Sequence, residues 1–147
     1  MSSQSLALAI ASSPEAIAQN QKVSELSREK DRLTQRVSDL ANSTTVLQQK
    51  QAQLQGAIDA GAAIIEGIQA TLPPGADASA LAVALLTNVD AVNSSGQITN
   101  LSIEIASAQL YVEQYTLAQQ DLIKVNTDLQ AAIVEGAGII LAIQNAM

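Results

Sequence analysis

The chain matches itself when it is shifted by 75 positions, and this internal repeat restricts the folds open to it. Between residues 54 and 69, ten of the sixteen positions are identical to their counterparts 75 residues later. A weaker match of residues 6–10 with residues 81–85 needs no gap. A fixed internal period indicates one structural unit written twice. We predict a tandem duplication, with repeat 1 at residues 1–72, a linker at residues 73–75 (Pro73-Pro74-Gly75) and repeat 2 at residues 76–147.

Each repeat is predicted to contain a short apolar segment, a polar break and a long helix. The first break is Ser12-Ser13-Pro14-Glu15, where Ser13 is expected to cap a helix and Pro14 suits the first helical position. The second break is predicted at Asn93-Ser94-Ser95-Gly96, after a short helix over residues 79–92. No proline lies within residues 16–72 or after residue 97, so we expect both long helices to be uninterrupted.

Apolar residues in both long stretches recur in alternating steps of three and four. This is the heptad spacing of a left-handed coiled coil, in which the two recurring positions form a seam. In repeat 1 the predicted packing and oligomer seam comprises Leu26, Leu33, Val37, Leu40, Leu47, Leu54, Ile58, Gly61, Ile65 and Ile68. In repeat 2 it comprises Leu101, Ile105, Val112, Tyr115, Leu122, Leu129, Ile133, Gly136, Ile140 and Ile143.

The connection between the two long helices predicts their direction. A helix of about 50 residues is roughly 75 Å long, and the partly helical segment before residue 97 is too short to return along it. We therefore predict an all-α fold: an elongated antiparallel helical hairpin or coiled coil with two long helices and short apolar helices, in an oligomeric bundle.

Polar residues interrupt both seams. Thr44, Gln51, Gln119 and Asn126 occupy seam positions, where a buried polar group can set register at a cost in stability. The alternative is that these positions are partly solvated and simply tolerated. Glycine at Gly61 and Gly136 favours close helix approach, either in dense packing in water or in a membrane.

Basic residues gather near the start of the first long helix. Lys22, Arg28, Lys30, Arg32 and Arg36 are five of the seven basic residues in the chain, and acidic residues lie between them. One interpretation is a solvated helix face with ion pairs one turn apart. The other makes Arg28, Lys30, Arg32 and Arg36 docking charges for an acidic surface on a neighbouring copy.

Composition excludes several classes of function. The chain has no His and no Cys, so it lacks imidazole bases, thiolate nucleophiles and the usual zinc ligands. We expect no catalytic residues, no metal and no cofactor. A formal net charge of −7 argues against binding of nucleic acid. Only two residues are aromatic, which is unusual for a rounded core but suits thin, closely packed helices.

A second apolar row, Ile103, Leu110 and Leu117, lies off the main seam and predicts contact with further helices or copies. We therefore predict a non-enzymatic structural or assembly protein that binds itself and other proteins of a larger assembly. In general composition it is similar to helical parts of phage tail, fibre or capsid-associated virion proteins.

The alternative function is a membrane-active, pore-forming-like helical protein that inserts its Gly/Ala/Ile-rich segments. The short apolar run at residues 6–11 lacks the basic flank of a signal peptide. No uninterrupted apolar stretch approaches the length of a transmembrane helix. We therefore expect a cytoplasmic or virion-associated location.

Overall fold

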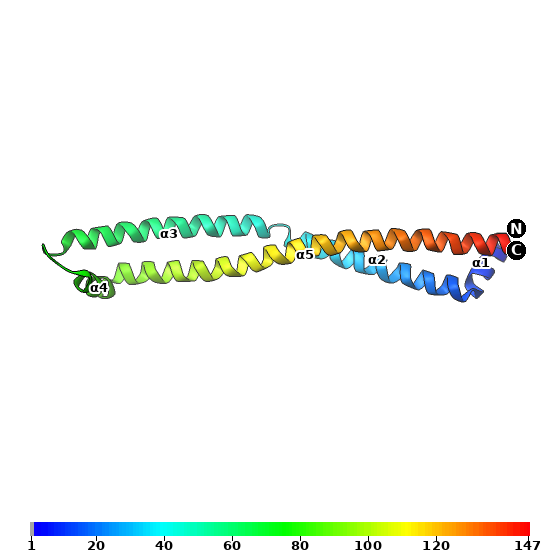
Figure 1. The fold of residues 1–147 in the computed structure, drawn as a ribbon, viewed down its shortest axis with the longest axis horizontal. Coiled ribbons are helices and arrows are strands. Elements are labelled where there is room, and N and C mark those ends of the chain that lie inside the picture. Colours follow the sequence, from blue (N-terminus) through cyan, green and yellow to red (C-terminus); the bar gives the residue numbers. More distant parts are fainter. Residues whose placement is uncertain (1) are drawn as a thin grey trace. The chain divides into compact units, whose positions relative to one another are not determined.

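The computed structural model describes residues 2–147 and is built from α-helices. The described residues contain no strand, and helices make up 92% of the structure. In chain order the helices are α1 (Ser3–Ser12), α2 (Pro14–Leu40), α3 (Ser43–Thr71), α4 (Ala78–Thr87) and α5 (Val89–Ala146) (Figure 1). The predicted all-α class is confirmed.

Side-chain caps begin four of these helices, α1, α2, α4 and α5. Ser13 caps α2 by accepting a hydrogen bond from the Ala16 amide at 3.2 Å, with Pro14 in the first turn, as the sequence predicts. Asp77 caps α4 in the same way, since its Oδ1 accepts from the Ala80 amide at 2.9 Å. These bonds satisfy amides that have no partner within their own helix.

The predicted break at Asn93-Ser94-Ser95-Gly96 is wrong, because α5 begins at Val89 and runs through these residues. The cap is Asn88, whose Oδ1 accepts from the Ala91 amide at 3.0 Å. The preceding helix α4 correspondingly ends at Thr87 rather than near residue 92. Polar residues are tolerated inside a helix that gains its stability from packing on one side.

The first long helix has one interruption, at Ala41 and Asn42, between α2 and α3. Both residues keep backbone angles in the right-handed helical region, and the Asn42 side chain makes no capping bond. The Ala41 amide donates to the Ser38 carbonyl at 3.3 Å, which closes a tight final turn. The predicted continuous helix over residues 16–72 is therefore divided into two helices, α2 and α3.

The helix bounds follow the 75-residue offset of the sequence. Adding 75 to the bounds of α1 gives those of α4, and adding 75 to the first residue of α2 and the last of α3 gives the bounds of α5. The capping residues Ser13 and Asn88 correspond in the same way. Corresponding residues of the two repeats can therefore be compared directly.

The helices form two compact units. The terminal unit consists of residues 2–41 and Gln114–Met147, and the central unit consists of Asn42–Glu113. In the terminal unit, Gln19 of α2 contacts Ala132 and Arg36 contacts Gln114, so α2 runs antiparallel to this part of α5. In the central unit, α3 runs antiparallel to the first part of α5 (Figure 1).

The buried core of each unit is thin and built largely from small residues. In the terminal unit the buried apolar residues are Ala16, Leu33, Ala118, Leu129 and Ala132. In the central unit they are Ala57, Leu101, Ile105 and Ala108. Alanine at the contact lets two helices approach closely, which accounts for the shortage of aromatic residues.

Candidate functional site

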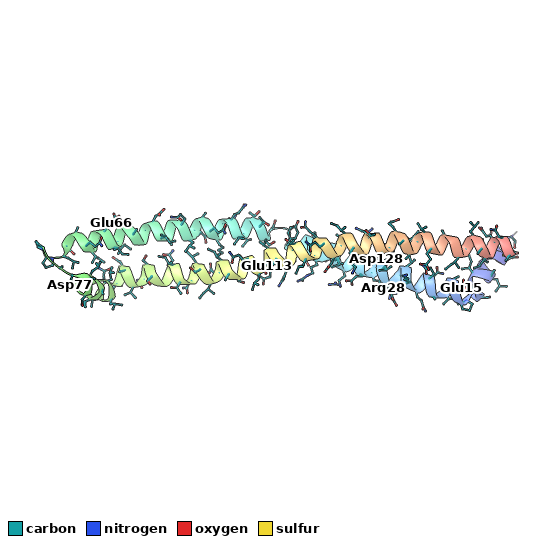
Figure 2. All side chains as sticks on the ribbon, viewed as in Figure 1. Glu15, Arg28, Glu66, Asp77, Glu113 and Asp128 are labelled. Atoms are coloured by element: carbon teal, nitrogen blue, oxygen red, sulfur yellow. The ribbon has the colours of Figure 1, made fainter. Side chains whose placement is uncertain are left out.

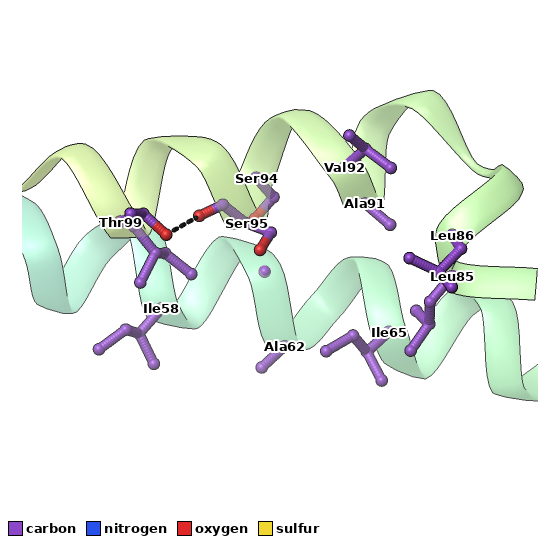
Figure 3. Close-up of a pocket in the computed structure, with 12 residues that line it drawn as sticks. Ile58, Ala62, Ile65, Leu85, Leu86, Ala91, Val92, Ser94, Ser95 and Thr99 are labelled. Atoms are coloured by element: carbon purple, nitrogen blue, oxygen red, sulfur yellow. Dashed lines mark hydrogen bonds between the residues drawn. The ribbon is translucent and has the colours of Figure 1, made fainter. Parts of the chain in front are cut away.

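The central unit contains an apolar groove between α3, α4 and the first turns of α5 (Figure 3). Its volume of about 570 Å³ falls within the range of small-molecule sites. Aliphatic side chains make most of the wall, with three hydroxyl residues on α5. The lining residues are Ile58, Gly61, Ala62, Ile65, Leu85, Leu86, Ala91, Val92, Ser94, Ser95, Ile98 and Thr99. The Thr99 hydroxyl is occupied in its own helix, donating to the Ser95 carbonyl at 3.0 Å.

Two small residues face each other at this groove. A Cβ atom added to Gly61 would lie 2.8 Å from the Ser94 hydroxyl oxygen and 3.4 Å from Cδ1 of Ile98. Glycine therefore permits the close approach of α3 and α5 here. Because Ser94 is short, it leaves the neighbouring space unfilled.

The corresponding place in the terminal unit is filled. At the 75-residue offset, Ser94 corresponds to Gln19, and Gly61 corresponds to Gly136. Gln19 is only 7% exposed, and its Nε2 donates to the Ala132 carbonyl at 2.7 Å. Its Cγ lies 3.2 Å from where a Cβ on Gly136 would stand. The glutamine side chain thus occupies the space that Ser94 leaves open in the central unit.

Sequence reasoning missed Gln19 because the predicted seam began at Leu26. Extending the same steps backwards by three, four and then three residues passes Val23 and reaches Gln19 and Ala16, both of which are buried. A polar residue at the end of an apolar pattern hides the continuation of that pattern.

Most predicted seam residues are buried or half-buried. Those in repeat 1 are Leu26, Leu33, Val37, Leu40, Leu47, Leu54, Gly61 and Ile68. Those in repeat 2 are Leu101, Ile105, Val112, Tyr115, Leu122, Leu129, Gly136, Ile140 and Ile143. The structure exposes Ile58, Ile65 and Ile133, and the residues just before them, Ala57, Ile64 and Ala132, face inward instead.

The polar seam residues are displaced in the same way. Thr44, Gln51 and Gln119 are exposed, and Asn126 is half-buried. At the first and third of these positions the preceding residues, Ser43 and Ala118, are buried. Thr44, Gln51 and Gln119 therefore face solvent rather than the contact between helices, and a role of the four polar residues in setting an oligomer's register stays a prediction.

The predicted docking charges all lie on α2, where Arg32 and Arg36 bind neighbouring side chains. Arg32 binds Glu29 one turn away, with Nη2 2.6 Å and Nε 2.9 Å from the carboxylate oxygens. The hydrogen bond from Arg32 lowers the pKa of the Glu29 carboxyl. The same hydrogen bond, together with the negative charge of Glu29, raises the pKa of Arg32. Arg36 donates to the Gln114 side chain at 3.1 Å. Arg28 is exposed on α2 (Figure 2), and Lys30 is half-buried.

Ion pairs also join α5 to its neighbours. Lys22 lies 3.8 Å from Glu135 in the terminal unit, and Lys50 lies 2.9 Å from Glu104 in the central unit. Both pairs are solvent-accessible, so each contributes at most about 1 kcal/mol. Among residues 2–147 no group of three or more acidic, His or Cys side chains could hold a metal ion.

One helix, α5, is long and apolar enough in part to cross a membrane. Its most apolar 18-residue stretch has a mean hydropathy of 1.3, and 11% of that stretch is buried in the structure. Length and composition alone also describe many core helices of soluble proteins. No protein family, curated protein or solved structure matches this chain.

Proposed function

We propose that this chain is a non-enzymatic structural protein that associates with further copies of itself through aliphatic helix surfaces, as part of a larger assembly. The observation that carries the proposal is the amount of large apolar side chain left on the surface. In the terminal unit the most exposed are Leu8, Leu117, Ile123, Val134 and Leu141. In the central unit they are Val83, Leu86, Val89, Ile103 and Leu110.

The total surface supports the same proposal. The chain exposes 9840 Å². A compact folded monomer of 15.2 kDa exposes about 7,100 Å², so roughly 2,700 Å² is in excess. A standard protein interface buries about 800 Å² per partner. Because each unit is a thin helix pair, it exposes more surface for its mass than a rounded fold does, and this surface is open to contact with further copies.

The internal contacts of one chain are modest. The cores are small, and the ion pairs between helices are exposed. Burying an exposed aliphatic side chain against another copy contributes at most about 1.5–3 kcal/mol, before the entropy cost of association. Association would therefore add stability that the single chain lacks.

Sedimentation equilibrium over a range of concentrations tests this proposal. We expect a mass that is a multiple of 15.2 kDa, together with a strongly helical circular dichroism spectrum. A monomer that persists at about 100 μM would contradict it, since an interface with a dissociation constant of about 10 μM or tighter is mostly associated there. The narrower proposal of a phage tail, fibre or capsid-associated component calls for imaging of the assembly in a virion.

The exposed apolar stretch of α5 favours a second candidate, a membrane-active helical protein. Flotation with phosphatidylcholine vesicles, with and without anionic lipid, distinguishes the two. Co-flotation of a chain that is monomeric in water supports the membrane candidate. An oligomer that stays with the aqueous fraction supports self-assembly.

A further inference from the structure

The groove of the central unit is a space that the same fold closes in the terminal unit. Four of its lining residues lie on α3, and each is identical to its counterpart on α5 at the 75-residue offset: Ile133, Gly136, Ala137 and Ile140. On the opposite helix, Ser94 stands where repeat 1 has the buried side chain of Gln19. Helix geometry therefore permits a filled groove, and the central unit gives up the packing contacts that filling it would supply.

Gln19 indicates which chemical group fits the open space. The Ser94 oxygen lies 2.8 Å, and the Gln19 Cγ lies 3.2 Å, from where a Cβ on the facing glycine would stand. The Ser94 oxygen thus takes the place of Cγ, and the carboxamide beyond Cγ has no counterpart in repeat 2. In the terminal unit that carboxamide donates to the Ala132 carbonyl at 2.7 Å. The counterpart of this acceptor is the Ala57 carbonyl, one turn before Gly61 on α3.

The rest of the groove suits an uncharged aliphatic chain. Figure 3 shows Ile65, Leu85 and Leu86 at one end of the groove, with Ile58 and Thr99 at the other. None of the lining residues carries a charge, so an ionised group would lose water there without gaining a partner. Residues 58 to 65 span two helical turns, about 10 Å along α3, which matches the length of a chain of about eight carbons.

We propose that this groove binds a neutral amphiphile, an aliphatic chain whose head donates a hydrogen bond as a primary carboxamide does. The head takes the place of the carboxamide that Gln19 supplies in the terminal unit, beside the Ser94 hydroxyl. The chain lies against the aliphatic wall of α3 and α4. All lining residues belong to the central unit, and this binding is a function separate from the self-assembly proposed above.

Isothermal titration of the full-length chain with octanamide tests the proposal. Ser94→Gln closes the groove with the side chain that repeat 1 uses, and Gln19→Ser opens the corresponding space in the terminal unit. The control is Ser107→Gln, which places the same side chain at an exposed position of α5. Octanoate, which is ionised at pH 7, tests whether the head must be neutral. Circular dichroism checks that every variant remains helical.

We expect one octanamide to bind per wild-type chain, with a dissociation constant of about 1 mM or tighter. Ser94→Gln should weaken binding by about tenfold or more, because its own carboxamide occupies the place of the head, and Ser107→Gln should leave binding within about twofold. A helical Gln19→Ser chain should bind two molecules. Octanoate should bind at least about tenfold more weakly than octanamide.

Three results would overturn the proposal. The first is a wild-type chain that binds no octanamide, and the second is a Ser94→Gln chain that binds it as tightly as the control does. The third is a Ser94→Gln substitution that weakens self-association while the wild type binds no octanamide, since the groove would then hold a side chain of a second copy. Equal binding of octanoate would contradict the neutral head.

Discussion

Gln19 makes both a buried hydrogen bond and a close packing contact between two helices. Its aliphatic stem lies against Gly136, and its amide donates to the Ala132 carbonyl of the opposite helix. A buried amide held this way requires one alignment of α2 with α5, because a shifted helix would leave the amide without its acceptor. Gln19 thus does within the chain what the sequence predicted for Thr44, Gln51, Gln119 and Asn126.

Replacing Gln19 with Ala should destabilise the chain by about 1–3 kcal/mol. The change removes a buried interhelical hydrogen bond and leaves space beside Gly136. Urea denaturation followed by circular dichroism measures the loss. The matched control is Gln21→Ala, an exposed glutamine on the same helix, which should change stability by less than about 0.5 kcal/mol. Equal effects of the two variants would contradict the role given to Gln19.

The groove beside Ser94 leads to the opposite prediction, a gain in stability when the residue is replaced by glutamine. We expect Ser94→Gln to stabilise the central unit by about 0.5–1.5 kcal/mol, since the longer side chain can fill the groove and donate to the Ala57 carbonyl, the counterpart of Ala132. Glutamine is also a better helix former than serine. The control Ser107→Gln, exposed on the same helix, isolates that smaller effect. A lower urea midpoint for Ser94→Gln would show that the groove cannot take the side chain.

The sequence predicted the start of α2 correctly but not the start of α5. Ser13 with Pro14 is a strong local signal, and the sequence identified it correctly. The start of α5 was missed because Asn93-Ser94-Ser95-Gly96 is the richer cluster of turn-forming residues, although the single residue Asn88 makes the capping bond. Local composition favours a turn at the cluster, but packing along α5 overrides it.

Substitutions at Asn88 and Asn93 separate these two positions. Asn88→Ala removes the cap of α5 and should cost about 1 kcal/mol of stability. Asn93→Ala lies inside the helix on an exposed position, where alanine is the better helix former, and should be neutral or slightly stabilising. The free energy of unfolding in urea measures both. If Asn93→Ala were the more damaging change, the helix would begin where the sequence first placed it.

The alignment of the helices could be predicted only in part, for a geometric reason. Strict heptads alternate steps of three and four without exception, whereas the inward positions of both repeats contain two successive steps of three. From Leu40 the inward positions step by three to Ser43 rather than by four to Thr44. The counterpart step in α5 leads from Tyr115 to Ala118. Spacing alone gives no signal for where such a correction falls.

For the molecule as a whole, the sequence predicted the helical class and the antiparallel direction that the helices take within each unit. It did not predict the two compact units or the groove, because both depend on which small residues meet across helices. Ser94 and Gln19 occupy corresponding positions, yet only the shorter one leaves a cavity. Exposed apolar surface, by contrast, was visible in the sequence at Ile103, Leu110 and Leu117.

The two units differ in how their parts are arranged along the chain. The central unit is one continuous segment, Asn42–Glu113, whereas the terminal unit combines residues 2–41 with Gln114–Met147. During synthesis the whole central unit is made before the second part of the terminal unit exists. Helices α1 and α2 are therefore synthesised before the part of α5 that belongs to their unit. Ala16 and Leu33 stay uncovered until that part of α5 emerges. During that interval, any other molecule that covers an apolar helix surface can bind this stretch of the nascent chain.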